Sequence, residues 1–242
     1  GPLVHFGATI GIIIKRYVSS RLSHEVYLGC GVAAAISAGF GAPIAGIIFA
    51  HEAVLRHFSV RAIAPISVAS ITASAVSQEI FTSSDVFNID ATAPDLMTVV
   101  PILIVASPII ATVAICYMWA LRYFTRLGQR TGWTPTRLIW TAATICGVVG
   151  IWIPQILGLG IGTINAMLDG VYALPALMVL LVMKIVMTAL CIGFGLFGGV
   201  FSPALFIGVA IGGAVAQIAI LVGLPDISVA LSIAAMAAVI GH

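Results

Sequence analysis

The segment at residues 198–203, Gly-Gly-Val-Phe-Ser-Pro, has the composition of a loop that leads into a helix. Proline is favoured in the first turn of a helix, where its missing N–H is not needed, so Pro203 predicts a helix that starts near residue 202. The start of a helix carries about half a positive elementary charge and several N–H groups without an acceptor inside the helix. An anion can bind there without a lysine. We therefore expect a candidate anion site along residues 198–203, where Gly198 and Gly199 precede the helix start.

The two glycines of this segment have two explanations. Gly198 and Gly199 would let the backbone approach an anion closely, but small residues also let two membrane helices pack together. The pattern alone favours neither explanation. A partial charge would suit a transported ion, because such an ion must bind weakly enough to leave.

A similar proline-led pattern occurs near the start of the chain, 201 residues earlier. At this offset six residues are identical: Pro2, Gly7, Ile10, Gly11, Ala33 and Ala34 match Pro203, Gly208, Ile211, Gly212, Ala234 and Ala235. We interpret this as an internal repeat. Basic residues close the first copy at Lys15 and Arg16 but not the second, so we expect the copies to be inverted. Transporters with inverted repeats place their sites near the middle of the membrane, where the N-termini of half-helices meet.

The elements that carry these motifs belong in a bilayer. Of the 242 residues, 61% are hydrophobic and 7% are charged, against about 45–50% and about 25% in soluble domains. Continuous apolar runs exclude the alternating strands of a β-barrel, so we expect an all-α, polytopic membrane fold. Helices are predicted at 2–16, 26–39, 43–56, 60–80, 98–128, 134–152, 163–169, 174–193, 202–222 and 228–241.

Several predicted helices are too short for the about 20 residues that a membrane crossing needs, notably 2–16, 26–39, 43–56 and 228–241. A broken helix at membrane depth is tolerated only inside protein or beside a water-filled cavity, and a binding site is the usual reason. We expect residues 1–242 to form one transmembrane domain, in which 1–80 is the later part of a first repeat and 98–242 is most of a second.

Basic and acidic residues occupy separate parts of the sequence. Lys and Arg form groups at 15–21, 56–61 and 122–137, whereas the acidic stretch 79–95 contains no Lys or Arg. Because Lys and Arg concentrate on the cytoplasmic side of membrane proteins, the basic groups are predicted to face the cytoplasm and the acidic stretch the outside. The net charge of +2 is too small to indicate a nucleic-acid partner.

Other reactive side chains form no recognisable site in the sequence. The four cysteines lack metal-ligand spacing and the five histidines include no pair four residues apart, so we predict neither a metal nor a cofactor. The motifs of intramembrane hydrolases are missing from the sequence, so we do not expect an enzyme. Lys184 lies inside an apolar span, where an ionisable residue suggests a function, although snorkelling or pairing inside the bundle explains it equally well.

Three stretches of the sequence match the motifs of one known family. Residues 184–213, KIVMTALCIGFGLFGGVFSPALFIGVAIGG, contain a G-G-x-F-x-P signature and a glycine-spaced helix. Residues 39–52, GFGAPIAGIIFAHE, match an A-P-x-x-G-x-x-F-x-x-E segment, and residues 1–7, GPLVHFG, match the end of G-K/R-E-G-P-x-V-H-x-G. The chain thus resembles the CLC family of chloride channels and chloride/proton antiporters, which has another glycine-rich stretch where this chain has residues 158–162. The resemblance implies the CLC fold, from the family's sixth helix to its fifteenth and truncated at both ends.

The resemblance also implies roles for particular residues. Chloride would be the substrate, bound by the backbone N–H groups of Val200 and Phe201, with Gly1 contributing from the opposing helix. The family's gating glutamate would immediately precede Gly1, and the chain starts without Met, so we expect a fragment. The resemblance further implies a homodimer in the lipid bilayer, and we expect this to be a bacterial plasma membrane.

Proton coupling depends on the residues that follow the second motif. Antiporters of the family often carry two adjacent glutamates there, the second as an intracellular proton acceptor, whereas this chain has Glu52-Ala53. Ala53 cannot accept a proton, so Glu52 or His51 would have to act as the relay; alternatively, Glu52 only pairs with Arg56 four residues later. The sequence therefore does not distinguish a voltage-gated-type channel from an antiporter. A secondary transporter of another solute with discontinuous helices is the alternative, but only Asp169 is acidic between 140 and 225.

Overall fold

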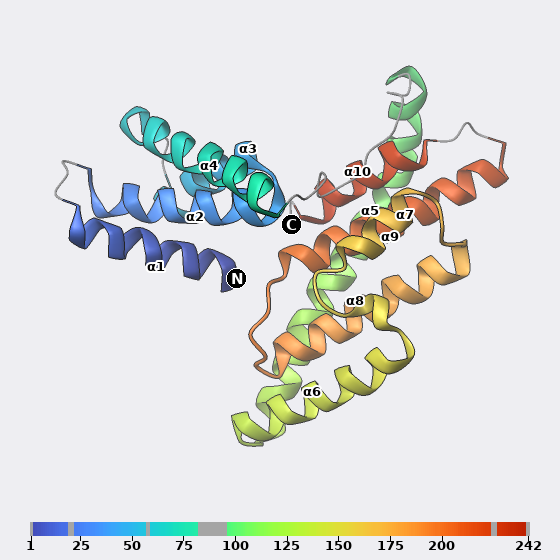
Figure 1. Ribbon diagram of the computed structural model, residues 1–242. Coiled ribbons are helices and arrows are strands. Elements are labelled where there is room, and N and C mark those ends of the chain that lie inside the picture. Colours follow the sequence, from blue (N-terminus) through green and yellow to red (C-terminus); the bar gives the residue numbers. More distant parts are fainter. Residues whose placement is uncertain (1, 19–21, 57–58, 82–95, 224–226, 241–242) are drawn as a thin grey trace. The chain divides into compact units, whose positions relative to one another are not determined.

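A computed structural model describes residues 2–18, 22–56, 59–81, 96–223 and 227–240. All regular structure in these ranges is helical, which confirms the all-α prediction. The chain divides into two compact units, unit 1 (residues 1–86) and unit 2 (residues 87–242). Unit 1 contains α1 (Pro2–Tyr17), α2 (His24–Phe40), α3 (Pro43–Phe49), the π-helix η1 (Ala50–Leu55) and α4 (Val60–Phe81). Unit 2 contains α5 (Leu96–Arg130), α6 (Pro135–Trp152), the 3-10 helix η2 (Pro154–Ile156), α7 (Ile161–Leu168), α8 (Leu174–Gly193), α9 (Phe201–Leu221) and α10 (Ser228–Ile240) (Figure 1).

Local capping explains where two helices begin earlier than predicted. The Ser23 side chain accepts a hydrogen bond from Val26 N at 3.4 Å and caps α2, which therefore starts at His24 instead of residue 26. Gly160 adopts a left-handed conformation with φ 74° and is the N-cap of α7, which starts at Ile161 instead of residue 163. Both differences lie within the usual uncertainty of helix ends.

The helix predicted at 43–56 changes its type along its length. α3 ends at Phe49, and the chain continues as a π-helix over Ala50–Leu55. Arg56 closes this element in a left-handed conformation with φ 58°. The prediction of one regular α-helix over this range was therefore wrong in its second half.

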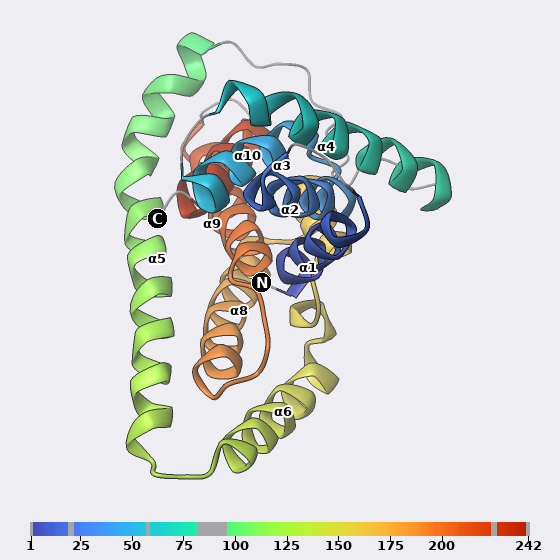
Figure 2. The same ribbon diagram turned by 90° about the vertical axis from the view of Figure 1, so that its left-hand side faces the viewer.

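Within the described ranges, four helices are long and apolar enough to cross a membrane. They cover Val60–Ile80, Val99–Arg130, Leu174–Gly193 and Phe201–Leu221. α5 runs along one side of unit 2 (Figure 2), and it exposes large apolar side chains, including Ile104 at 67%, Val105 at 73% and Trp119 at 64%. Lipid tails are as apolar as these side chains, so their exposure is that of a helix facing a bilayer.

α9 lies at the centre of unit 2. It packs against α5, α7, α8 and α10 (Figure 1). Of its membrane-spanning window, 78% is buried by the rest of the structure, against 22% for α5. A helix that is apolar on all sides is typical of such an interior position, and the loop from α8 leads directly into its N-terminus.

Glycines allow one helix pair in each unit to pack backbone to backbone. A Cβ at Gly7 of α1 would lie 2.6 Å from Ala35 Cβ in α2, and a Cβ at Gly208 of α9 would lie 2.5 Å from Met236 Cα in α10. The two glycines are 201 residues apart, and so are their two partners. A second set has the same offset: Gly11 against Gly31, and Gly212 against Ser232. The two helix pairs therefore pack in the same register.

Candidate functional site

α8 ends in a tight turn that the sequence analysis did not identify. Gly195 adopts φ 91°, its N–H donates to Ile192 O at 3.1 Å, and Leu196 N donates to Cys191 O at 2.9 Å. This is the Schellman arrangement, in which a left-handed glycine closes a helix. A glycine directly after a long apolar helix is the sequence signal for it. The turn directs the chain towards Gly198.

Four of the predicted site residues, Gly198, Gly199, Val200 and Phe201, lie between this turn and the first turn of α9. Val200 is the N-cap residue, with φ −83° and ψ −18°, and Phe201 is the first helical residue. No side chain caps this N-terminus and its first turn contains no acidic residue. Val200 is 48% exposed and Phe201 38% exposed. The partial positive charge at a helix start favours an anion.

Contacts with the described residues do not require a glycine at position 198. A Cβ at Gly198 would lie 3.7 Å from Ile192 Cγ1, which is an ordinary contact. Gly193 differs, because a Cβ there would lie 2.6 Å from the carbonyl carbon of Phe124 in α5. Helix packing therefore explains Gly193 but not Gly198. A role of Gly198 in the approach of an anion stays a prediction.

A second loop, residues 154–160, is attached to the first turn of α9. Ser202 is 9% exposed, and its Oγ donates to Leu159 O at 2.9 Å. Gly158 and Gly160 adopt left-handed conformations, with φ 62° and 74°, which only glycine adopts readily. The glycine-rich stretch identified in the sequence thus forms the turns that present the Leu159 carbonyl to Ser202.

Lys184 holds the same loop from α8. The side chain is 3% exposed, and its Nζ donates to Ile156 O at 2.7 Å and to Gly158 O at 3.1 Å. Nζ also lies 4.8 Å from the centre of the Phe206 ring in α9, within the range of a cation–π interaction. In the part of the chain that the structure describes, no carboxylate pairs with it. Lys184 therefore does not snorkel to the surface, and two carbonyls and one ring stabilise its ammonium group.

α5 contributes a contact to the start of α9 that the sequence analysis missed. Tyr117 is 4% exposed, and its hydroxyl donates to Val200 O at 3.2 Å. The same carbonyl accepts the helical hydrogen bond from Ala204 N at 3.1 Å. A tyrosine in a long apolar helix has no sequence pattern that connects it with a loop 83 residues later.

The predicted relay residues lie in unit 1, in the π-helix η1. His51 is fully buried, and its Nδ1 lies 2.9 Å from Ile47 O. Glu52 is exposed, and among the described residues no ion pair joins it to Arg56, which ends the helix. π-helical turns occur frequently at functional sites. Gly1, the remaining predicted site residue, lies outside the described residues.

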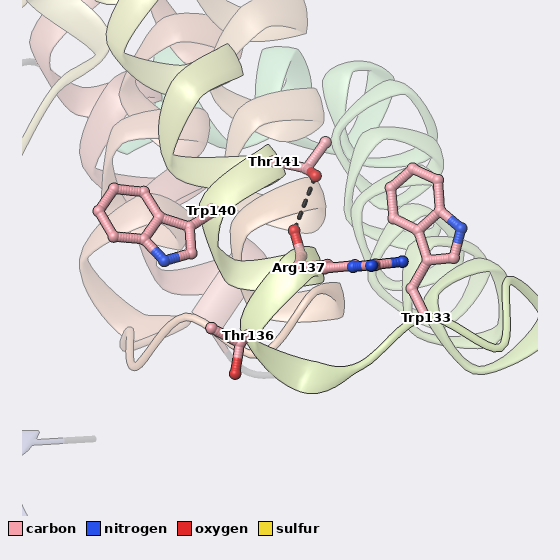
Figure 3. A pocket seen from close by; sticks show the side chains of 5 residues that line it. All are labelled: Trp133, Thr136, Arg137, Trp140 and Thr141. Atoms are coloured by element: carbon pink, nitrogen blue, oxygen red, sulfur yellow. Dashed lines mark hydrogen bonds between the residues drawn. The ribbon is translucent and has the colours of Figure 1, made fainter.

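An open pocket of about 410 Å³ lies at the start of α6, and none of the predicted site residues lines it. Trp133, Thr136, Arg137, Trp140 and Thr141 line it, and the Arg137 side chain is directed towards Trp133 (Figure 3). Thr141 Oγ1 donates to Arg137 O at 2.7 Å, a bond within one helix.

The described residues also contain no group of three or more His, Cys, Asp or Glu side chains that could hold a metal ion.

Comparisons with known proteins agree on one family. The family model described as voltage gated chloride channel matches residues 1–242. The chain is 27% identical over 224 residues to a putative chloride channel protein ClcB-like of Ralstonia nicotianae, an alignment that covers 88% of this chain and 51% of that protein. It is 29% identical over 233 residues to the H(+)/Cl(−) exchange transporter ClcA of Vibrio cholerae, covering 90% of this chain and 48% of that protein. The chain thus spans about half the length of these relatives.

Solved structures show the same fold. A CLC-type fluoride/proton antiporter has a TM-score of 0.78 and 25% identity, over 99% of this chain and 59% of that one. A slow cyanobacterial Cl−/H+ antiporter has a TM-score of 0.83 and 18% identity, over 100% of this chain and 58% of that one. These similarities confirm the fold that the sequence motifs implied.

Proposed function

The chain belongs to the voltage gated chloride channel family, and from this premise we propose that the protein carries chloride, or another small anion, across a membrane. The observation that supports this most directly is the start of α9, where Val200 and Phe201 are partly exposed at a helix N-terminus without a capping side chain. The chain is an integral, multi-pass membrane protein, and its described residues include four helices long and apolar enough to cross a bilayer. Its bacterial relatives support a bacterial plasma membrane as its location.

In the proposed site, backbone groups bind the anion. The N–H groups of Val200 and Phe201 would donate to it, and Gly198 and Gly199 would leave room for its approach. From family membership alone, Gly1 would contribute to the anion site as well. Partial charges of this kind hold an anion less tightly than a lysine would, and a transported ion must leave as readily as it enters.

We also propose that the chain contains two inverted repeats, with residues 1–80 as the later part of the first and 98–242 as most of the second. α1 packs against α2 in the same register in which α9 packs against α10, and this supports the repeat. Pro2 and Pro203 would then mark equivalent helix starts. From family membership alone, the complete protein would be a homodimer with one pathway in each subunit.

For proton coupling we propose Glu52 as the intracellular proton acceptor. Its side chain carries a carboxylate and is exposed, whereas Ala53 cannot accept a proton. His51, the other predicted relay residue, is fully buried beside it in the same π-helix. The unusual helix type at this position supports a functional role.

Chloride efflux from liposomes that contain the complete protein tests the proposed function. We expect efflux that starts when a potassium ionophore removes the opposing voltage. The reversal potential measured against a proton gradient at fixed chloride then separates the two transport modes, because a pure channel for anions shows no shift with pH. Uptake of sodium or an amino acid in the absence of chloride would contradict the proposal.

A further inference from the structure

The contact between Tyr117 and Val200 acts on a peptide group that belongs to the proposed anion site. A trans peptide unit is planar, and its C=O and N–H groups point in opposite directions. The Val200 carbonyl and the Phe201 N–H belong to the same unit. The hydroxyl of Tyr117, which donates to Val200 O at 3.2 Å, therefore helps to fix the direction of the Phe201 N–H.

This peptide lies where a helix is least restrained. Val200 is an N-cap residue without a side-chain hydrogen bond of its own, and helix ends fray more readily than helix interiors. Its carbonyl has two lone pairs and accepts from Ala204 N at 3.1 Å as well as from Tyr117. The bond from Ala204 is part of α9, whereas the bond from Tyr117 ties the same peptide to a neighbouring helix.

A hydrogen bond to the carbonyl also changes the strength of the N–H as a donor. Hydrogen bonds in a chain polarise one another, by about 10–30% per bond in condensed-phase estimates. A donor on Val200 O withdraws electron density from the peptide and makes the Phe201 N–H a stronger donor. Orientation and polarisation therefore act in the same direction, towards tighter anion binding.

Tyr117 is well placed to restrain this peptide. It is 4% exposed, and α5 packs against α9 within unit 2. Its neighbour Tyr123, six residues later in α5, is 48% exposed and stacks on Trp119 with ring centres 5.2 Å apart. One tyrosine of α5 thus reaches the start of α9, and the other lies on the exposed side.

We propose that Tyr117 is a positioning residue for the anion site: through the Val200 carbonyl it orients and polarises the Phe201 N–H that binds the anion. Tyr117 does not touch the anion in this scheme. The inference rests on the proposed function, because it requires that the start of α9 binds an anion.

The test compares Tyr117→Phe with Tyr123→Phe in the complete protein. Each substitution removes one hydroxyl and keeps the ring, so the helix and its packing are retained. Isothermal titration with chloride should show a dissociation constant about two- to tenfold higher for Tyr117→Phe, the effect of one net hydrogen bond, and no change for Tyr123→Phe. Thiocyanate accepts hydrogen bonds less strongly than chloride, so its binding should weaken less.

The possible results distinguish the role of Tyr117 from the proposed anion transport on which it depends. If the wild-type protein neither binds nor transports chloride, the proposed function fails. If the wild type binds chloride and Tyr117→Phe binds it equally well, the role of Tyr117 alone is refuted. A lower melting temperature with equal losses for chloride and thiocyanate would also refute it, because general loosening of the fold would then explain the result.

Discussion

Glu52 is the residue that we propose as the intracellular proton acceptor. We expect Glu52→Gln to abolish proton movement coupled to chloride and to leave chloride flux unchanged, because the carboxamide cannot take up a proton and the side chain is exposed. Proton flux into liposomes, followed with a pH-sensitive dye, measures the effect. Glu25→Gln is the matched control, since Glu25 is an exposed carboxylate in the first turn of α2. Coupling that survives in Glu52→Gln would exclude this relay.

The positions of single residues in the candidate anion site were largely predictable from the sequence, but the contacts around them were not. Pro203 and the two preceding glycines predicted a helix start near residue 202, and the structure begins α9 at Phe201. That prediction uses only local backbone preferences. The bond from Tyr117 to Val200 joins residues 83 positions apart, and it depends on how α5 packs against α9, which no local pattern encodes.

Among the elements, the 154–160 loop depends on Lys184. We expect Lys184→Met to lower the free energy of unfolding by about 2 kcal/mol, because Ile156 O and Gly158 O would lose their buried donor. Lys184→Arg should lower the free energy of unfolding by less, because arginine keeps a charged donor. Thermal unfolding in detergent provides the measurement.

Lys15→Met is the matched control for this change. Lys15 is the other lysine of the sequence, lies 5.3 Å from the centre of the Tyr27 ring in unit 1 and is only partly buried. Its replacement should alter stability little. Equal stability of the Lys184→Met and wild-type proteins would show that the loop does not need the ammonium group.

The α-helices themselves were predictable because their apolar runs are long and their ends carry glycine, proline or a capping serine. Two changes of helix type could not be predicted from the sequence. The π-helix over Ala50–Leu55 and the 3-10 turn over Pro154–Ile156 contain 6 and 3 residues, too few for a distinct periodicity. Hydrogen bonding and tertiary contacts decide the helix type in such short segments.

At the scale of the whole molecule, the repeated glycine contacts predict equal sensitivity in both units. We expect Gly7→Ala and Gly208→Ala each to destabilise the protein by about 3 kcal/mol or to prevent folding, because the new Cβ would overlap α2 or α10. Gly147→Ala in α6 is the control, since nothing lies within 4 Å of a Cβ there. It should be neutral or stabilising by about 0.5–1 kcal/mol. Melting temperatures of the purified variants would measure both effects, and a Gly208→Ala protein as stable as wild type would contradict the close packing.

In the proposed site, backbone N–H groups at the start of α9 bind the anion, and Val200→Pro removes one of these groups. Proline removes the N–H of residue 200, its ring fixes φ near −65°, and Val200 already has φ −83°. Val200→Ala keeps the N–H and controls for the lost side chain. Titration with chloride should give a dissociation constant at least about tenfold higher for Val200→Pro, the effect of one hydrogen bond to a charged partner, and a wild-type value for Val200→Ala. Wild-type chloride affinity in a folded Val200→Pro protein would contradict the account.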